Sequence, residues 1–177
     1  MKCISLYQPW ASAIAYGWKT IETRTHERFR GLVGERIGIH AGKKWDKHAL
    51  EIWKKSIGPE QYFRIKEHVI SLLQQYHVSH NDREAAELRW GDFESGRWVP
   101  KEDSLIFPRG KLICSVEVTH QGWLPEMKEY ANAALIELHM KRHGLWLGRP
   151  QLIWPPMKMV GRQGIWSFDL QPAQVVV

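Results

Sequence analysis

Two different periodicities divide this chain, and they constrain its fold more than any other feature of the sequence. Apolar and polar residues alternate in short segments near both ends, as they do in strands that bury one face. Between residues 46 and 90 the apolar residues instead recur about every three and a half positions, which is typical of amphipathic helices. The strand-like segments are residues 3–7, 20–25, 36–40, 112–119, 151–154 and 164–170. We therefore expect a mixed α/β (α+β) fold, a small β-barrel with peripheral helices and a helical insertion.

The clearest of these strands is predicted over residues 112–119. Its even-numbered residues Leu112, Cys114, Val116 and Val118 are all apolar and alternate with a more polar set. Because successive side chains of a strand point to opposite faces, we expect these four residues to share one apolar face.

Proline and glycine residues predict where several elements begin and end. Residues 10–16 lie between Pro9 and Gly17, as expected for a helix with proline in its first turn and glycine as its terminator. A second helix is expected over residues 125–140, with residues 141–144 as its basic last turn and glycine stop. Residues 41–44 are expected to form a basic loop after the strand that ends at residue 40.

Composition limits the class of protein and favours a polyanionic partner. The 177 residues, of which 44% are hydrophobic, are expected to form a single domain over 1–177 with a helical insertion at about 46–103. A formal charge of +6 and a pI near 9.4 favour binding to nucleic acid. The two cysteines and the scattered histidines predict no metal site, and no cofactor is expected. With no signal peptide and no apolar run of membrane-spanning length, we expect a cytoplasmic protein without a membrane partner.

Three charged residues lie in and beside the second strand-like segment. On a strand, Glu22 and Arg24 point to the same face, and Lys19 stands at its entrance. A carboxylate between two cations stays ionised, so the trio is suited to hold a polar or anionic ligand. The alternative is an ordinary ion pair between neighbouring strands.

The motifs around this trio resemble those of the ASCH domain family. They comprise residues 4–11 (ISLYQPWA), the GxKxxExR pattern of residues 17–24, and residues 30–31, 39–44, 110–116 and 164–166. The resemblance implies a PUA-like β-barrel with a cleft beside the first helix, lined by Lys19, Glu22 and Arg24. It also implies binding of RNA or other nucleic acid, and some bacterial members are hydrolases, either ribonucleases or amidohydrolases of acetylated cytidine. In those amidohydrolases a threonine occupies the position of Glu22, which counts against that activity here.

Further binding residues are predicted around the trio. Trp10 could stack on a base at the rim of the cleft, unless it only packs the helix against the barrel. His40 could carry a proton, and Lys43 and Lys44 could follow a phosphate backbone, the alternative being a satisfied strand end and a solvated loop. Gln8, within the first motif, completes the predicted ligand-binding set.

Three classes of function remain open on the sequence. The preferred one is binding of RNA or another nucleotide-like ligand in the cleft. The second is hydrolysis of RNA or a modified nucleoside, with Lys19 as base and Glu22 positioning water or shuttling protons. The third is a protein-interaction domain that docks a partner on the insertion at 46–103.

Overall fold

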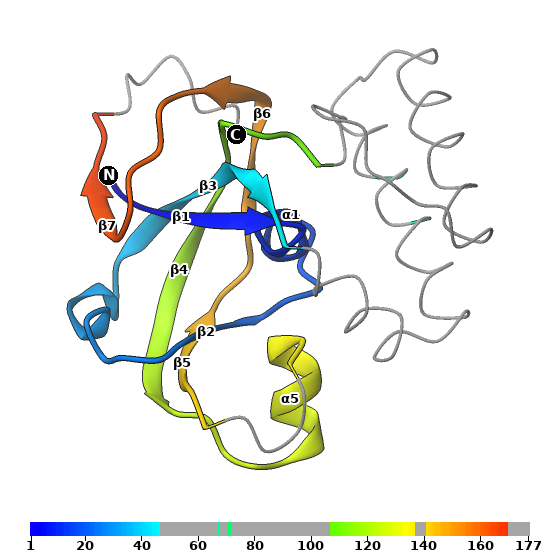
Figure 1. Cartoon of the computed structure of the whole chain (residues 1–177), viewed down its shortest axis with the longest axis vertical. Helices are drawn as coiled ribbons and strands as arrows, with labels where there is room; N and C mark the ends of the chain where they lie inside the picture. The colour runs from blue at the N-terminus through cyan, green and yellow to red at the C-terminus, as the bar shows by residue number, and fades with distance from the viewer. Residues whose placement is uncertain (47–66, 68–70, 72–106, 137–140, 170–177) are drawn as a thin grey trace.

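A mixed sheet forms the framework of the protein (Figure 1). The computed structural model describes residues 1–46, 67, 71, 107–136 and 141–169. Its strands are β1 (Lys2–Gln8), β2 (Ile21–Arg24), β3 (Arg36–Trp45), β4 (Lys111–Trp123), β5 (His143–Leu147), β6 (Gln151–Lys158) and β7 (Ile165–Ser167). Two α-helices, α1 (Trp10–Ala15) and α5 (Lys128–Ala134), and the 3-10 helix η1 (Arg30–Leu32) complete the described elements.

The strand order is β2-β5-β4-β3-β1-β7, and β6 pairs with β4 outside this path. The β1–β3 pair is parallel, whereas the other pairs are antiparallel. This arrangement confirms the expected mixed, sheet-dominated fold. Within the described residues the path does not close, because its end strands β2 and β7 are not paired with each other, and the closed barrel stays a prediction.

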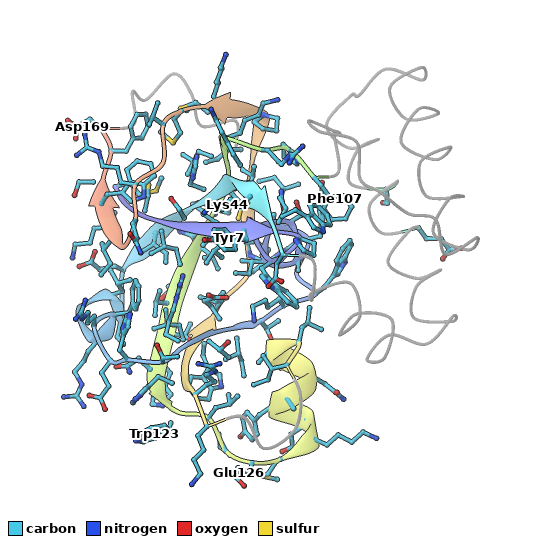
Figure 2. The ribbon with its side chains drawn as sticks, viewed as in Figure 1. Tyr7, Lys44, Phe107, Trp123, Glu126 and Asp169 are labelled. Carbon is cyan, nitrogen blue, oxygen red and sulfur yellow. The ribbon has the colours of Figure 1, made fainter. Side chains whose placement is uncertain are left out.

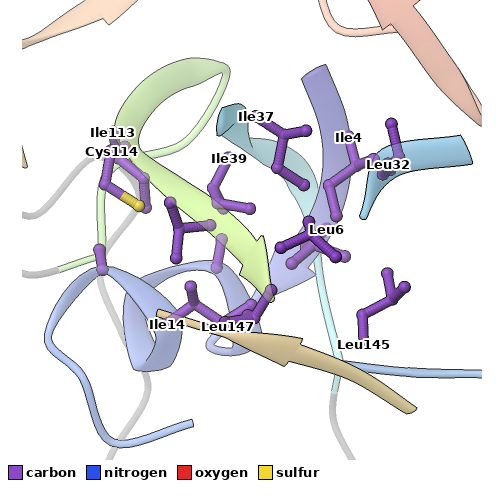
Figure 3. Packing of buried hydrophobic residues seen from close by; sticks show 14 of the residues in the cluster. Ile4, Leu6, Ile14, Leu32, Ile37, Ile39, Ile113, Cys114, Leu145 and Leu147 are labelled. Carbon is purple, nitrogen blue, oxygen red and sulfur yellow. The ribbon is translucent and has the colours of Figure 1, made fainter. Parts of the chain in front are cut away.

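The main core lies between helix α1 and strands β1, β3, β4 and β5 (Figure 3). Strands β1 and β3 supply alternate apolar residues to it, as their sequence pattern predicts. Its fully buried members include Ile4, Ile14, Leu32, Ile37, Ile39, Val116 and Leu145. Gly17 ends the helical turn with a φ of +77°, which confirms its expected role as terminator.

The prediction of one apolar face for residues 112–119 is wrong at its first member. Ile39 pairs with Cys114 but His40 pairs with Leu112, so Ile113 is an extra residue in β4. Such a bulge exchanges the faces on its two sides. Ile113 and Cys114 therefore both join the main core, while Leu112 packs against Cys3 in a second cluster.

The expected basic loop at residues 41–44 is also wrong. Strand β3 continues through this segment to Trp45, because its far end pairs with β1 at Gln8 and its Ala41 pairs with Lys111 of β4. Lys43 and Lys44 therefore lie within the strand, where its pairing with β1 shifts register between Leu6 and Gln8.

The expected helix over residues 125–140 is shorter, and a strand replaces its basic end. Helix α5 stops at Ala134 because Leu135 takes a left-handed conformation with a φ of 51°. His143 and Gly144 are not a helix end but begin β5, which pairs with both β2 and β4. Leu145 and Leu147 of this strand are both buried, and their alternation is a sequence signal for it that our sequence analysis did not use.

The helical insertion predicted at about 46–103 lies almost wholly outside the described residues, so the single-domain organisation stays a prediction. In the part of the chain that the structure describes, no helix is both long and apolar enough to cross a membrane.

Candidate nucleic-acid interface

The predicted charged trio comes together at the end of the sheet. Strand β2 is positioned by β5, with Glu22 opposite Leu145 in the pairing. The Glu22 carboxylate lies between the two cations, with Oε1 3.2 Å from Arg24 Nη2 and Oε2 3.6 Å from Lys19 Nζ. The three side chains therefore form one ion-pair network.

Within that network Lys19 is the most deeply buried of the three residues. Its side chain is 3% exposed, and its ammonium group donates a hydrogen bond to the backbone carbonyl of Ala134 at the end of α5. Burial lowers the pKa of Lys19. Glu22 opposes this effect, and Arg24 adds to it. Lys19 does not line the groove described next, whereas Glu22 and Arg24 do.

A broad groove with a volume of about 1350 Å³ opens beside the network. Its walls come from residues 5–7 of β1, residues 42–44 of β3, residues 109–111 at the start of β4, and residues 158–164 between β6 and β7. It is larger than the pockets of about 300–1,000 Å³ that hold most small ligands. The size suits an extended ligand better than a single small molecule.

Positive charge dominates the lining of this groove. Among the described residues that line it, Glu22 is the one acidic side chain, and the basic ones are Arg24, Lys43, Lys44, Arg109, Lys111, Lys158 and Arg162. We call this feature the basic groove. Charge of one sign along a concave wall concentrates ligands of opposite charge, here polyanions.

Three aromatic side chains that line the basic groove differ in exposure and in their contacts. Tyr7 is 52% exposed, and its ring lies 5.9 Å from Lys44 Nζ (Figure 2). Phe29 is buried beneath the Arg24 guanidinium, at 5.0 Å. Trp10 lines the groove, and its indole N–H donates to Asp46 at 2.8 Å.

His40 lines the groove but is held on both ring nitrogens. Nε2 lies 3.3 Å from the carbonyl oxygen of Met159, so it must carry the proton, and Nδ1 accepts from the Ser5 hydroxyl at 3.1 Å. Ser5 in turn accepts from Trp166 Nε1 at 3.3 Å. Burial lowers the pKa of His40. The neutral ring is thus a satisfied member of a hydrogen-bonded chain.

Gln8, another predicted binding residue, does not line the groove. Its side chain is completely buried, and its amide accepts from the backbone N–H of Ser12 at 3.2 Å. The same amide donates to Ser12 Oγ and to the Pro108 carbonyl, at 2.9 and 2.7 Å. These bonds fix the start of α1 against the segment that leads into β4.

Sequence reasoning missed part of the basic groove. It did not include Tyr7, Arg109, Lys111, Lys158 or Arg162, which come from β1 and from two distant segments. The basic, glycine-containing stretch at 158–164 was the one available indication of the second segment. Within the described residues, no cluster of three or more His, Cys, Asp or Glu side chains is arranged to hold a metal ion.

Comparison with known proteins identifies the family. The ASCH domain family model matches residues 4–130, well over half of the chain. A structure described as ASCH from Zymomonas mobilis aligns over 98% of this chain and 89% of that chain, with 13% identity and a TM-score of 0.47. No curated protein was found to match the sequence. On the family match, the chain belongs to the ASCH domain family.

Proposed function

We propose that this protein binds RNA, or another nucleotide-like ligand, in the basic groove. The observation that carries the proposal is the excess of lysine and arginine over acidic side chains along the groove. Neutralising phosphates with such side chains releases counterions, which is the main source of affinity for nucleic acid.

The groove residues suggest a division of roles. Lys43 and Lys44 are exposed on β3 and are suited to contact phosphates. Arg24 is one-quarter exposed and presents a planar guanidinium whose position is set by Glu22 and by the Phe29 ring. Glu22 is acceptor-only when ionised, so it is suited to the amino groups of a base edge.

Binding of a 12-nucleotide single-stranded RNA, measured by fluorescence anisotropy between about 50 and 200 mM salt, tests the proposal. We expect the double substitution Lys43→Ala/Lys44→Ala to weaken binding and to reduce the slope of log K against log salt by about 1.4, or 0.7 for each lost phosphate contact. The matched control is Lys128→Ala/Arg149→Ala, which removes two exposed charges outside the groove. Equal loss in both double variants would indicate attraction to net charge alone.

Hydrolysis of RNA or a modified nucleoside is the second candidate, and one observation favours it. Burial lowers the pKa of Lys19, and a lysine with a lowered pKa can serve as a general base. However, Lys19 is buried and does not line the groove, and its ammonium group already donates to the Ala134 carbonyl. We therefore assign Lys19 a supporting role in ligand binding and rank hydrolysis second.

A further inference from the structure

Tyr7 is the most exposed aromatic residue that lines the basic groove among the described residues, and the proposed function gives it no role. Alternation along β1 sends Ile4 and Leu6 into the core and Tyr7 to the opposite side. More than half of its surface is open to solvent. Such an arrangement presents a large flat ring to any ligand in the groove.

Gly42 and Lys44 of β3 form the groove wall beside the Tyr7 ring. The neighbouring residue on β3 is Gly42, where an added Cβ would lie 3.9 Å from Tyr7 Cδ1 and 3.2 Å from the Leu6 carbonyl oxygen. A side chain at position 42 would therefore crowd the Leu6 carbonyl and would contact the edge of the ring, whereas glycine leaves that edge uncovered. Lys44 follows on the same strand and holds its ammonium group near the ring. An aromatic ring can stack on a base while an adjacent ammonium group contacts the phosphate of the same nucleotide.

The other two aromatic side chains of the groove are less available. Trp10 is less exposed than Tyr7, and its N–H is bonded to Asp46. Phe29 is 4% exposed, and Arg24 covers it. Tyr7 therefore provides the accessible ring surface of this part of the groove.

We propose that Tyr7 is a stacking platform for an unpaired base, so that the ligand of the basic groove is single-stranded RNA rather than a duplex. This inference rests on the proposed function. Every base has a π face, and stacking on an aromatic side chain is tolerant of sequence. In a duplex the base faces are already stacked on one another, so no base face inside the helix would be free to stack on Tyr7.

Exposure alone does not support this role. Trp123 is more exposed than Tyr7, at 64%, but its ring packs on His143 at 4.0 Å and lies far from Lys44 (Figure 2). Single exposed aromatic residues are common on protein surfaces. The distinguishing feature of Tyr7 is its position in a groove lined by cations.

The test compares Tyr7→Leu and Tyr7→Phe with the matched control Trp123→Leu, which replaces an exposed aromatic residue outside the groove. Each variant is titrated with the same labelled 12-nucleotide single-stranded RNA and with its 12-base-pair duplex. We expect Tyr7→Leu to weaken single-strand binding about 5- to 150-fold, the range that corresponds to losing one base–aromatic stack. The salt slope should stay unchanged, because no phosphate contact is lost. Tyr7→Phe should retain binding, since the ring is kept.

The outcomes separate this inference from the function on which it rests. If the wild-type protein binds neither RNA, both proposals fail. If binding depends on Lys43 and Lys44 but Tyr7→Leu binds the single strand as well as wild type does, the groove is an RNA site and the stacking role is overturned. A preference for the duplex, or an equal loss in Trp123→Leu, would also overturn it. Thermal melting of each variant establishes that a loss of binding is not a loss of folding.

Discussion

At the scale of single residues, the buried ion-pair network is the feature on which the site most depends. Lys19 is 3% and Glu22 7% exposed, so each charge has lost most of its hydration and depends on its partners. Removing one partner leaves the other charge buried and poorly compensated. We therefore expect Lys19→Met to lower the free energy of unfolding by about 3–5 kcal/mol, measured by urea denaturation.

A double-mutant cycle separates this coupling from simple packing. Adding Glu22→Gln to Lys19→Met removes the uncompensated carboxylate, so the double variant should lose less stability than the sum of the two single variants. The control is the Lys2–Glu35 pair, in which both side chains are about two-fifths exposed at an N–O distance of 2.5 Å. Lys2→Met should change stability by only about 0–1 kcal/mol. Strict additivity in the buried pair would contradict the network.

At the scale of elements, the sequence was most informative where one local pattern decides the structure. The alternation of residues 3–7, 36–40 and 151–154, and the sequence from Pro9 to Gly17, predicted β1, the first half of β3, the start of β6 and α1. The bulge at Ile113 and the extension of β3 depend on pairing with distant strands, which no local pattern encodes. The same limit applies to the site. The trio lies within one short segment and was found, whereas Arg109, Lys158 and Arg162 reach the groove only through the fold.

Close packing of β3 gives a prediction at this scale. An added Cβ at Gly38 would lie 2.7 Å from Cys3 Sγ and 2.8 Å from Leu112 Cδ1, so the second core cluster has no room for it. We expect Gly38→Ala to lower the free energy of unfolding by about 1–3 kcal/mol. The control is Gly31→Ala, because nothing lies within 4 Å of an added Cβ there. Equal effects of the two substitutions in thermal or urea unfolding would refute the packing argument.

At the scale of the whole molecule, His40 joins segments that are far apart in the sequence. Its two ring nitrogens contact Ser5 of β1 and the Met159 carbonyl, and its ring lies edge-on to Trp166 of β7 at 5.8 Å. Gly161 packs against it so closely that an added Cβ would lie 2.1 Å from His40 Cε1. The wall of the basic groove at 158–164 is therefore held against β3 through one neutral imidazole.

This arrangement predicts how stability depends on pH. Because burial lowers the pKa of His40 in the folded protein, the unfolded chain binds more protons below its ordinary pKa of about 6.5. The contribution of neutral His40 to the free energy of unfolding is therefore complete above about pH 6.5. It is lost as the pH falls from there through the lowered pKa of His40 in the folded protein. In urea denaturation between about pH 7.5 and 5, wild type should lose stability relative to His40→Gln as the pH falls. Glutamine keeps an N–H donor for the Met159 carbonyl but cannot titrate. Comparing the two proteins cancels the contributions of the other histidines, so parallel pH profiles would mean that His40 is not held neutral by the fold.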